Sequence, residues 1–198
     1  MNKLLTTLVA GSLFAATSAH ALDDYTEHNF KVSTGNLSLT ARDYDGLDKW
    51  MGQIDYKIDV PFVSGLAYRY QESKGSVEHR YRVNFKPVLK YGNLSVTPRA
   101  EWRAFDKESK DDFGNVWLRV QYKQPITESL SGYILLQPKF AFDNDNFSDG
   151  EYYTSQNQIG LDYKVTSNVT FGIFGEKNYD EDWKTDSIFL GTNVSVKF

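Results

Sequence analysis

The stretch VEHRYRVNFK, residues 77–86, alternates strictly between two kinds of side chain. One set is apolar or aromatic with a single histidine, and consists of Val77, His79, Tyr81, Val83 and Phe85. The other set carries three cations and one acid, and consists of Glu78, Arg80, Arg82, Asn84 and Lys86. Successive side chains of a strand point to opposite faces. The stretch therefore predicts a β-strand with one apolar face and one basic face.

The first residues have the composition of a secretory signal peptide. Lys3 supplies a positive charge, residues 4–19 are mostly apolar, and Ala19-His20-Ala21 has the small residues of a cleavage site. We expect residues 1–21 to be removed and residues 22–198 to form a single mature domain. An uncleaved membrane anchor is the alternative, but the apolar run is shorter than the roughly 20 residues that span a bilayer.

The composition of the mature chain favours a β-rich exported protein. The chain has no cysteine, so packing and hydrogen bonds must hold it without disulfides. The full chain has a net charge of −4, yet aromatic residues make up 15% of it, with 13 Tyr and 13 Phe. No run after residue 21 approaches the length of a membrane helix. A membrane β-barrel has this composition, because polar lumen residues dilute the lipid-facing ones, although soluble sandwiches and lipocalin-like barrels share the alternation.

Alternation along the mature chain predicts ten strands and no long helix. They cover about 28–42, 49–58, 64–71, 77–90, 94–105, 115–123, 130–142, 152–164, 169–179 and 186–198. The first is the weakest, because Ser33-Thr34-Gly35 interrupts it and residues 25–33 could form a separate element.

The connections between these strands alternate in length. Short connections alternate with longer or more acidic connections, which lie near 43–48, 72–76, 106–114, 143–151 and 180–185. Outer-membrane barrels have short periplasmic turns and longer outer loops. The expected fold class is therefore all-β, a transmembrane antiparallel up-and-down barrel of about ten strands, with twelve as the alternative. Ten strands would place both ends of the barrel wall on the periplasmic side.

Two further features favour an outer-membrane barrel. Tyr56, Tyr91, Tyr122 and Tyr163 each end a predicted strand before a short turn, on the apolar face, as in an aromatic girdle. Ordinary β-propensity is the plainer explanation for these tyrosines. The last strand ends in Phe198 and resembles the C-terminal signature of bacterial outer-membrane barrels. We therefore expect the outer membrane of a Gram-negative cell, contacts with lipid and lipopolysaccharide, and recognition of the final strand by the barrel-assembly machinery.

Strand parity predicts a basic barrel interior. Fourteen cations fall on the inward face: Arg42, Lys57, Arg69, Arg80, Arg82, Lys86, Lys90, Arg99, Arg103, Arg119, Lys123, Lys139, Lys164 and Lys197. Five acids share it: Asp55, Glu78, Glu101, Asp162 and Glu176. Rings of Arg and Lys are typical of anion or phosphate pores. A closed polar core is the alternative, but a filled core needs near charge balance, because unpaired buried charge is costly.

Prolines disturb the regular pattern at three places, Pro87, Pro98 and Pro138, where a strand would lose a ladder donor. We expect a bulge or a break in the wall near Pro87. A regular hairpin turning at Gly92-Asn93 would set Arg82 opposite Arg103, Asn84 opposite Glu101 and Lys86 opposite Arg99.

The sequence shows little sign of an enzyme. The two mature-chain histidines, His28 and His79, have no evident serine partner with an orienting acid. The acidic stretch at 143–151 lacks the spacing of an EF-hand loop. We expect no catalytic residues, no metal and no cofactor; a barrel hydrolase using paired loop acids is the third interpretation.

The chain resembles the oligogalacturonate-specific porin (KdgM-type) family and its sialic-acid-porin relatives. The likeness lies in VEHRYRVNFKPVLKY with SVTPRAEWR following, the inward Arg and Lys tracks, and the terminal aromatic strand, and is sharpest over residues 77–123. It implies a monomeric barrel that passes acidic oligosaccharides along basic tracks, with Arg80, Arg82, Arg99, Arg103 and Arg119 as track residues. The family has twelve strands, so a barrel of ten would have a narrower lumen.

The resulting hypothesis is an outer-membrane porin whose basic lumen passes small anionic solutes, above all acidic oligosaccharides of the oligogalacturonate kind. The lumen residues expected to bind solute are Arg69, Arg80, Arg82, Lys86, Arg99, Arg103, Arg119, Lys123 and Lys139. We expect a monomer without a nucleic-acid partner. The alternative is a non-conducting structural or adhesive barrel that acts through its acidic outer loops.

Overall fold

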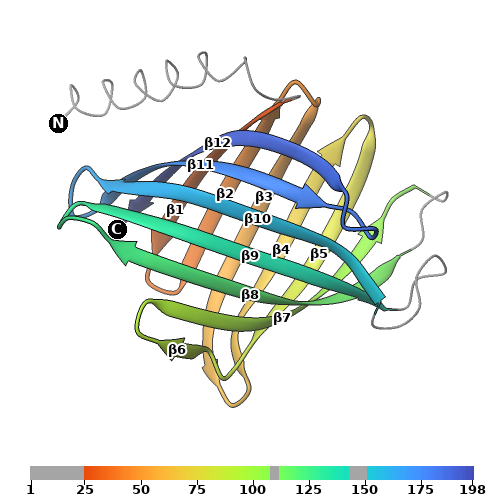
Figure 1. The fold of residues 1–198 in the computed structure, drawn as a ribbon. Coiled ribbons are helices and arrows are strands. Elements are labelled where there is room, and N and C mark those ends of the chain that lie inside the picture. The colour runs from red at the N-terminus through yellow and green to blue at the C-terminus, as the bar shows by residue number, and fades with distance from the viewer. Residues whose placement is uncertain (1–24, 108–111, 143–150) are drawn as a thin grey trace.

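The structure, a computed structural model, describes residues 25–107, 112–142 and 151–198. The expected signal peptide and most of the acidic stretch at 143–151 lie outside the described residues. The described chain is all-β (Figure 1). Its strands are β1 (Thr26–Thr34), β2 (Leu37–Asp45), β3 (Lys49–Val60), β4 (Val63–Ser73), β5 (Ser76–Phe85), β6 (Leu89–Tyr91), β7 (Leu94–Phe105), β8 (Phe113–Pro125), β9 (Leu130–Phe142), β10 (Glu151–Lys164), β11 (Val169–Tyr179) and β12 (Thr185–Lys197). No helix among the described residues is long and apolar enough to cross a membrane.

The strands form one sheet that closes into a barrel. Neighbours follow the chain from β1 to β5 and from β7 to β12, β1 pairs with β12, and β5 pairs with β7. Eleven strands thus close the barrel, and the three-residue strand β6 is an addition that pairs with β7 alone. The all-β barrel is confirmed. The expected count of ten strands is too low, and the observed count is near the alternative of twelve.

The missing strand lies in the weak first candidate. Residues 28–42 are not one strand but parts of β1 and β2, joined by a turn at Gly35-Asn36 in which Gly35 has a φ of +52°. Glycine adopts positive φ without steric cost, so a tight hairpin forms here. The same Gly-Asn pair occurs at the predicted turn 92–93, where Gly92 has a φ of +56°.

An odd number of wall strands forces a parallel seam. β1 pairs with β12 in parallel, with Thr26 beside Leu190 and Ser33 beside Lys197. The start of β1 and the end of β12 therefore lie at opposite ends of the barrel, and the expectation that both lie at one end is wrong. We call the end that holds Asp45 the loop end and the end that holds the Gly35-Asn36 turn the turn end.

The expected break at Pro87 is confirmed, and it changes the strand register. β5 and β6 both pair with β7, but the chain leaves the ladder at residues 86–88. Near the turn, Tyr91 pairs with Leu94 as a regular hairpin requires. Beyond the break the register shifts by two residues. Arg80 now lies opposite Arg103, Arg82 opposite Glu101, and Asn84 opposite Arg99. The pairs expected from an unbroken hairpin are therefore wrong, while the face of every side chain is preserved, because the shift is even.

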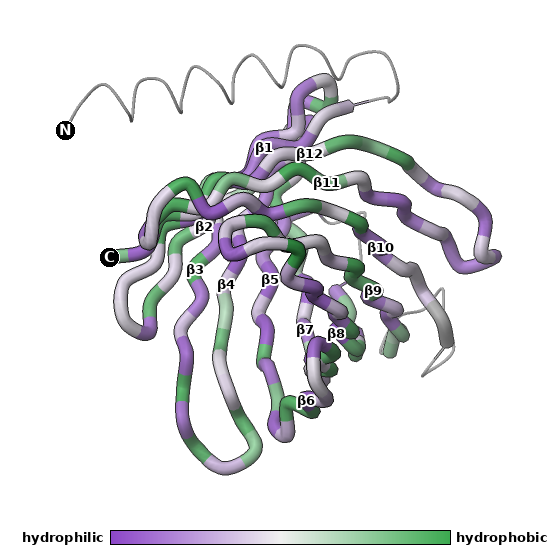
Figure 2. Tube along the Cα trace, turned by 60° about the vertical axis from the view of Figure 1, so that its left-hand side comes forward, coloured by the Kyte–Doolittle hydropathy of each residue, from purple (hydrophilic) through white to green (hydrophobic). Residues whose placement is uncertain are grey.

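The outer surface of the barrel is apolar along much of its height. Exposed outward side chains from many strands include Phe30, Leu39, Ile54, Leu66, Val116, Leu118, Ile134, Leu136, Ile159, Leu161, Ile173 and Ile188. Apolar and polar residues alternate along the strands in Figure 2. Tyr56, Tyr91, Tyr122 and Tyr163 are also exposed, near the turn end. Their expected position on the outer face near one end of the barrel is confirmed; a girdle at a membrane interface stays a prediction.

Two of the connections expected to be longer are tight. Residues 46–48 join β2 to β3, and residues 74–75 join β4 to β5. Positive φ values of +90° at Gly46 and +71° at Gly75 make these reversals possible. At residues 180–184 the connection is held by Asp180, whose side chain accepts the backbone N–H groups of Asp182 and Lys184 at 3.1 and 2.8 Å.

Candidate functional site

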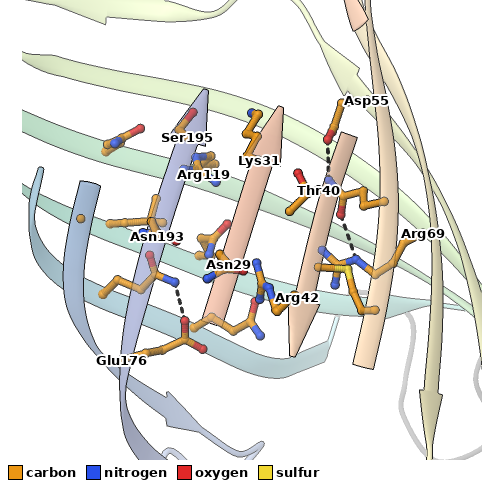
Figure 3. Close-up of a pocket in the computed structure, with 18 of the residues that line it drawn as sticks. Asn29, Lys31, Thr40, Arg42, Asp55, Arg69, Arg119, Glu176, Asn193 and Ser195 are labelled. Atoms are coloured by element: carbon orange, nitrogen blue, oxygen red, sulfur yellow. Dashed lines mark hydrogen bonds between the residues drawn. The ribbon is translucent and has the colours of Figure 1, made fainter. Parts of the chain in front are cut away.

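The barrel encloses a cavity of about 680 Å³ lined mainly by polar side chains. Figure 3 shows these side chains pointing inward from strands around the wall. Nine cations line it: Lys31, Arg42, Lys49, Arg69, Arg80, Arg82, Arg99, Arg119 and Lys123. Three acids share the lining: Asp55, Asp162 and Glu176. The lumen therefore carries an excess of positive charge, although the chain as a whole is acidic.

Most of the predicted lumen residues lie where parity placed them. Six of the nine line the cavity: Arg69, Arg80, Arg82, Arg99, Arg119 and Lys123. Arg103 and Lys139 also lie within the barrel, engaged in contacts with other inward side chains. Lys86 does not line the cavity. It sits at the break in the wall, where its Nζ lies 2.5 Å from Oδ1 of the exposed Asp59.

Parity overestimated the basic lumen at the turn end. Four cations expected to face inward are exposed there and do not line the cavity: Lys57, Lys90, Lys164 and Lys197. They lie at strand ends beside the short connections, where the inward face of the ladder meets open solvent. These four cations therefore do not add to the enclosed charge.

Sequence reasoning missed three charged residues of the interior: Glu27, Lys31 and Lys49. Glu27 is completely buried, and Lys31 and Lys49 line the cavity. Glu27 and Lys31 were missed because the Gly35-Asn36 turn reverses the parity between β1 and β2, as the pairing of Ser33 with Ser38 shows. A continuous strand over residues 28–42 would point Lys31 outward. Recognising the Gly35-Asn36 turn would have placed the side chain of Lys31 on the inward face.

A buried ion network occupies the wall near the loop end. Glu78 of β5 accepts hydrogen bonds from Arg80 Nε and Nη2, both at 2.8 Å, and from Arg103 Nε. Gln71 Nε2 donates to the same carboxylate at 3.1 Å. Arg103 also donates to the hydroxyl of Tyr153 at 2.7 Å. The single carboxylate of Glu78 lies between two guanidinium groups, so these three side chains together carry a net positive charge.

A second set of ion pairs joins β5 to β3 and β7. Arg82 Nη2 lies 2.6 Å from Asp55 Oδ1 of β3, and Arg80 Nη1 lies 3.7 Å from Glu101 Oε1 of β7. Arg69 donates instead to the amide oxygen of Gln53 at 2.9 Å. The shifted register places Arg82 opposite Glu101 instead of Arg103, while Arg80 now lies opposite Arg103 and depends on Glu78 for compensation.

Two further acids lie on β1 and β11. Glu176 of β11 accepts a hydrogen bond from Gln158 Nε2 at 2.5 Å, which is drawn in Figure 3. Glu27 of β1 pairs with Arg42 at 3.1 Å and accepts from Asn29 at 2.6 Å. Acids therefore occur on both sides of the lumen, and low-dielectric walls focus the field of the cations that exceed them.

The histidines lie outside this site. His79 Nδ1 is 2.7 Å from the Tyr68 hydroxyl, its Nε2 is 3.2 Å from Asp106, and neither His79 nor His28 lines the cavity. Within the described residues, no group of three or more His, Cys, Asp or Glu side chains could hold a metal ion. Comparison with known proteins finds no protein family and no curated protein that matches the chain.

Proposed function

We propose that the protein is an outer-membrane porin that lets small anionic solutes, in particular acidic oligosaccharides, diffuse through a basic lumen. The observation that carries the proposal is that the two faces of the barrel wall differ in chemistry. The outer face is apolar, and the cavity on the inner face is lined by nine cations and three acids. A barrel that spans a bilayer requires an apolar outer band, because lipid solvates no charge.

The lumen charge supports selectivity for anions. A basic surface between low-dielectric walls raises the local concentration of anions and repels cations. Guanidinium groups such as those of Arg82, Arg99 and Arg119 can donate two parallel hydrogen bonds to one carboxylate. Several such groups in series, each binding weakly, would let a solute enter and leave. The resemblance to oligogalacturonate-specific porins supports oligogalacturonate as the test solute.

Single-channel recording of the refolded protein in a planar bilayer tests the proposal. Under a KCl gradient we expect discrete conductance, an anion-selective reversal potential and block by oligogalacturonate. Arg82→Gln combined with Arg103→Gln should weaken both selectivity and block. Lys74→Gln removes one positive charge from the exposed turn between β4 and β5 and serves as the control. No conductance from a correctly folded barrel would overturn the porin proposal and favour a structural or adhesive barrel.

A further inference from the structure

Three cations converge on one tryptophan inside the barrel. Trp117 of β8 is only 5% exposed. Its ring centroid lies 4.8 Å from Lys139 Nζ of β9, 4.9 Å from Arg99 Cζ of β7 and 6.0 Å from Arg82 Cζ of β5. Arg119 follows two residues later on the same face of β8. Each cation gains from the electron-rich ring, but the cations repel one another at this spacing.

The carboxylates around this cluster do not balance its charge. Asp55 pairs with Arg82 at 2.6 Å. Glu101 faces Arg82 across the β5–β7 ladder, but its ion-pair contact is with Arg80. Throughout the described part of the chain, no carboxylate lies within ion-pair distance of Arg99, Arg119 or Lys139. Four cations thus share at most two carboxylates.

The same place holds buried hydrogen-bond donors without acceptors. Arg82 Nε, Arg99 Nε and the indole Nε1 of Trp117 are inaccessible and have no partner among the described residues. An unsatisfied buried donor is costly, and more so when it is charged. Arg82, Arg99, Trp117 and Arg119 also line the cavity, so an anion in the lumen could approach them.

We propose that Arg82, Arg99, Trp117, Arg119 and Lys139 form a binding site, the Trp117 site, for a doubly charged oxyanion. The ligand is a free sulfate or hydrogen phosphate dianion, or a phosphate monoester of a sugar, which also carries two charges. Asp55 and Glu101 together compensate at most two of the four cations. A ligand with two negative charges matches the positive charge that remains. Oxygens that point in several directions suit guanidinium and indole donors that come from different strands. The site depends on the proposed function only for how the anion reaches the lumen.

Equilibrium binding to the refolded mature chain in neutral detergent tests the site without requiring conductance. The probes are sodium sulfate, monomeric galacturonate with its single carboxylate, and sodium chloride at matched ionic strength, followed by calorimetry and tryptophan fluorescence. We expect sulfate to bind at least tenfold more tightly than galacturonate and chloride to give no saturable signal. Phenyl phosphate, a monoester that keeps two charges, is compared with sodium hydrogen phosphate. Binding as tight as that of the free anion would identify a group on a larger molecule as the ligand, and weaker binding would identify the free anion.

Variants locate the site. Arg99→Gln should weaken sulfate binding at least tenfold, Lys139→Gln should do the same if Arg99→Gln does not fold, and Lys74→Gln should leave it within about twofold. Trp117→Phe should abolish the fluorescence change, since Trp50, Trp102 and Trp183 are exposed elsewhere. Sulfate binding no tighter than galacturonate, or unchanged in both charge variants, would overturn the proposal. Sulfate binding by a barrel that carries no current would leave the Trp117 site standing and overturn the porin function instead.

Discussion

Glu78→Gln tests whether the interior near the loop end is a dry ion network or a wetted lumen. Glu78 is 5% exposed, and its carboxylate receives two hydrogen bonds from Arg80, one from Arg103 and one from Gln71. Glutamine keeps the size of the side chain and one acceptor oxygen. It removes the charge that compensates two buried guanidinium groups.

The expected cost follows from the contacts that remain. Removing one partner of a buried ion pair typically destabilises a protein by about 3–5 kcal/mol, because the other charge stays buried. Arg80 keeps Glu101 at 3.7 Å, and Arg103 keeps the Tyr153 hydroxyl at 2.7 Å. These contacts offset part of the loss, so we expect a destabilisation of about 3 kcal/mol. In a water-filled lumen, screening would reduce the loss to about 1 kcal/mol or less.

Urea unfolding of the barrel in lipid vesicles, followed by tryptophan fluorescence, measures this loss as a change in midpoint at constant slope. Glu72→Gln is the matched control. Glu72 lies on the outer face, where it accepts hydrogen bonds from Trp50 at 3.2 Å and Tyr70 at 3.4 Å, and its loss should cost less than about 1 kcal/mol. Equal, small losses for both variants would refute the buried network. The freed arginines should also raise anion selectivity in Glu78→Gln.

Three further predictions concern the wall itself. Gly191→Ala should destabilise the barrel by about 1–3 kcal/mol, because the added Cβ would meet the ring of Phe174, and unchanged urea stability would contradict that packing. Ile159→Arg should cost about 2–4 kcal/mol in vesicles, because Ile159 is 65% exposed on the outer wall; a loss near zero would place that wall in water. In a chain without cysteine, Val83→Cys with Ala100→Cys should crosslink on oxidation, seen as a gel shift, and no crosslink would argue against the shifted register.

The fold class and most of the site could be predicted because they depend on a period of two. In residues 77–86 the apolar and basic faces separate without knowledge of any neighbour, and the structure keeps that separation. The same rule placed Arg69, Arg99 and Arg119 in the lumen. It failed at Lys31, because a two-residue turn reverses parity and alternation alone does not reveal where a strand stops.

Parity also says nothing about where along a strand the lumen begins. Lys86, predicted as a lumen residue, instead pairs with Asp59 at the break in the wall. Its position depends on Pro87, which cannot donate to the ladder and so ends the pairing of β5. The sequence indicated a break there but not that the register would shift by two residues.

The sequence by itself determined which side chains point outward from the barrel and which point inward. Apolar side chains point outward, basic side chains point inward, and polar turns join the strands. That follows from local backbone geometry, which alternates regardless of the fold. Only the tertiary structure decided the number of strands, the parallel seam of β1 with β12, and the convergence of Arg82, Arg99 and Lys139 on Trp117. These depend on register and closure, which are set by pairings between segments far apart in the chain.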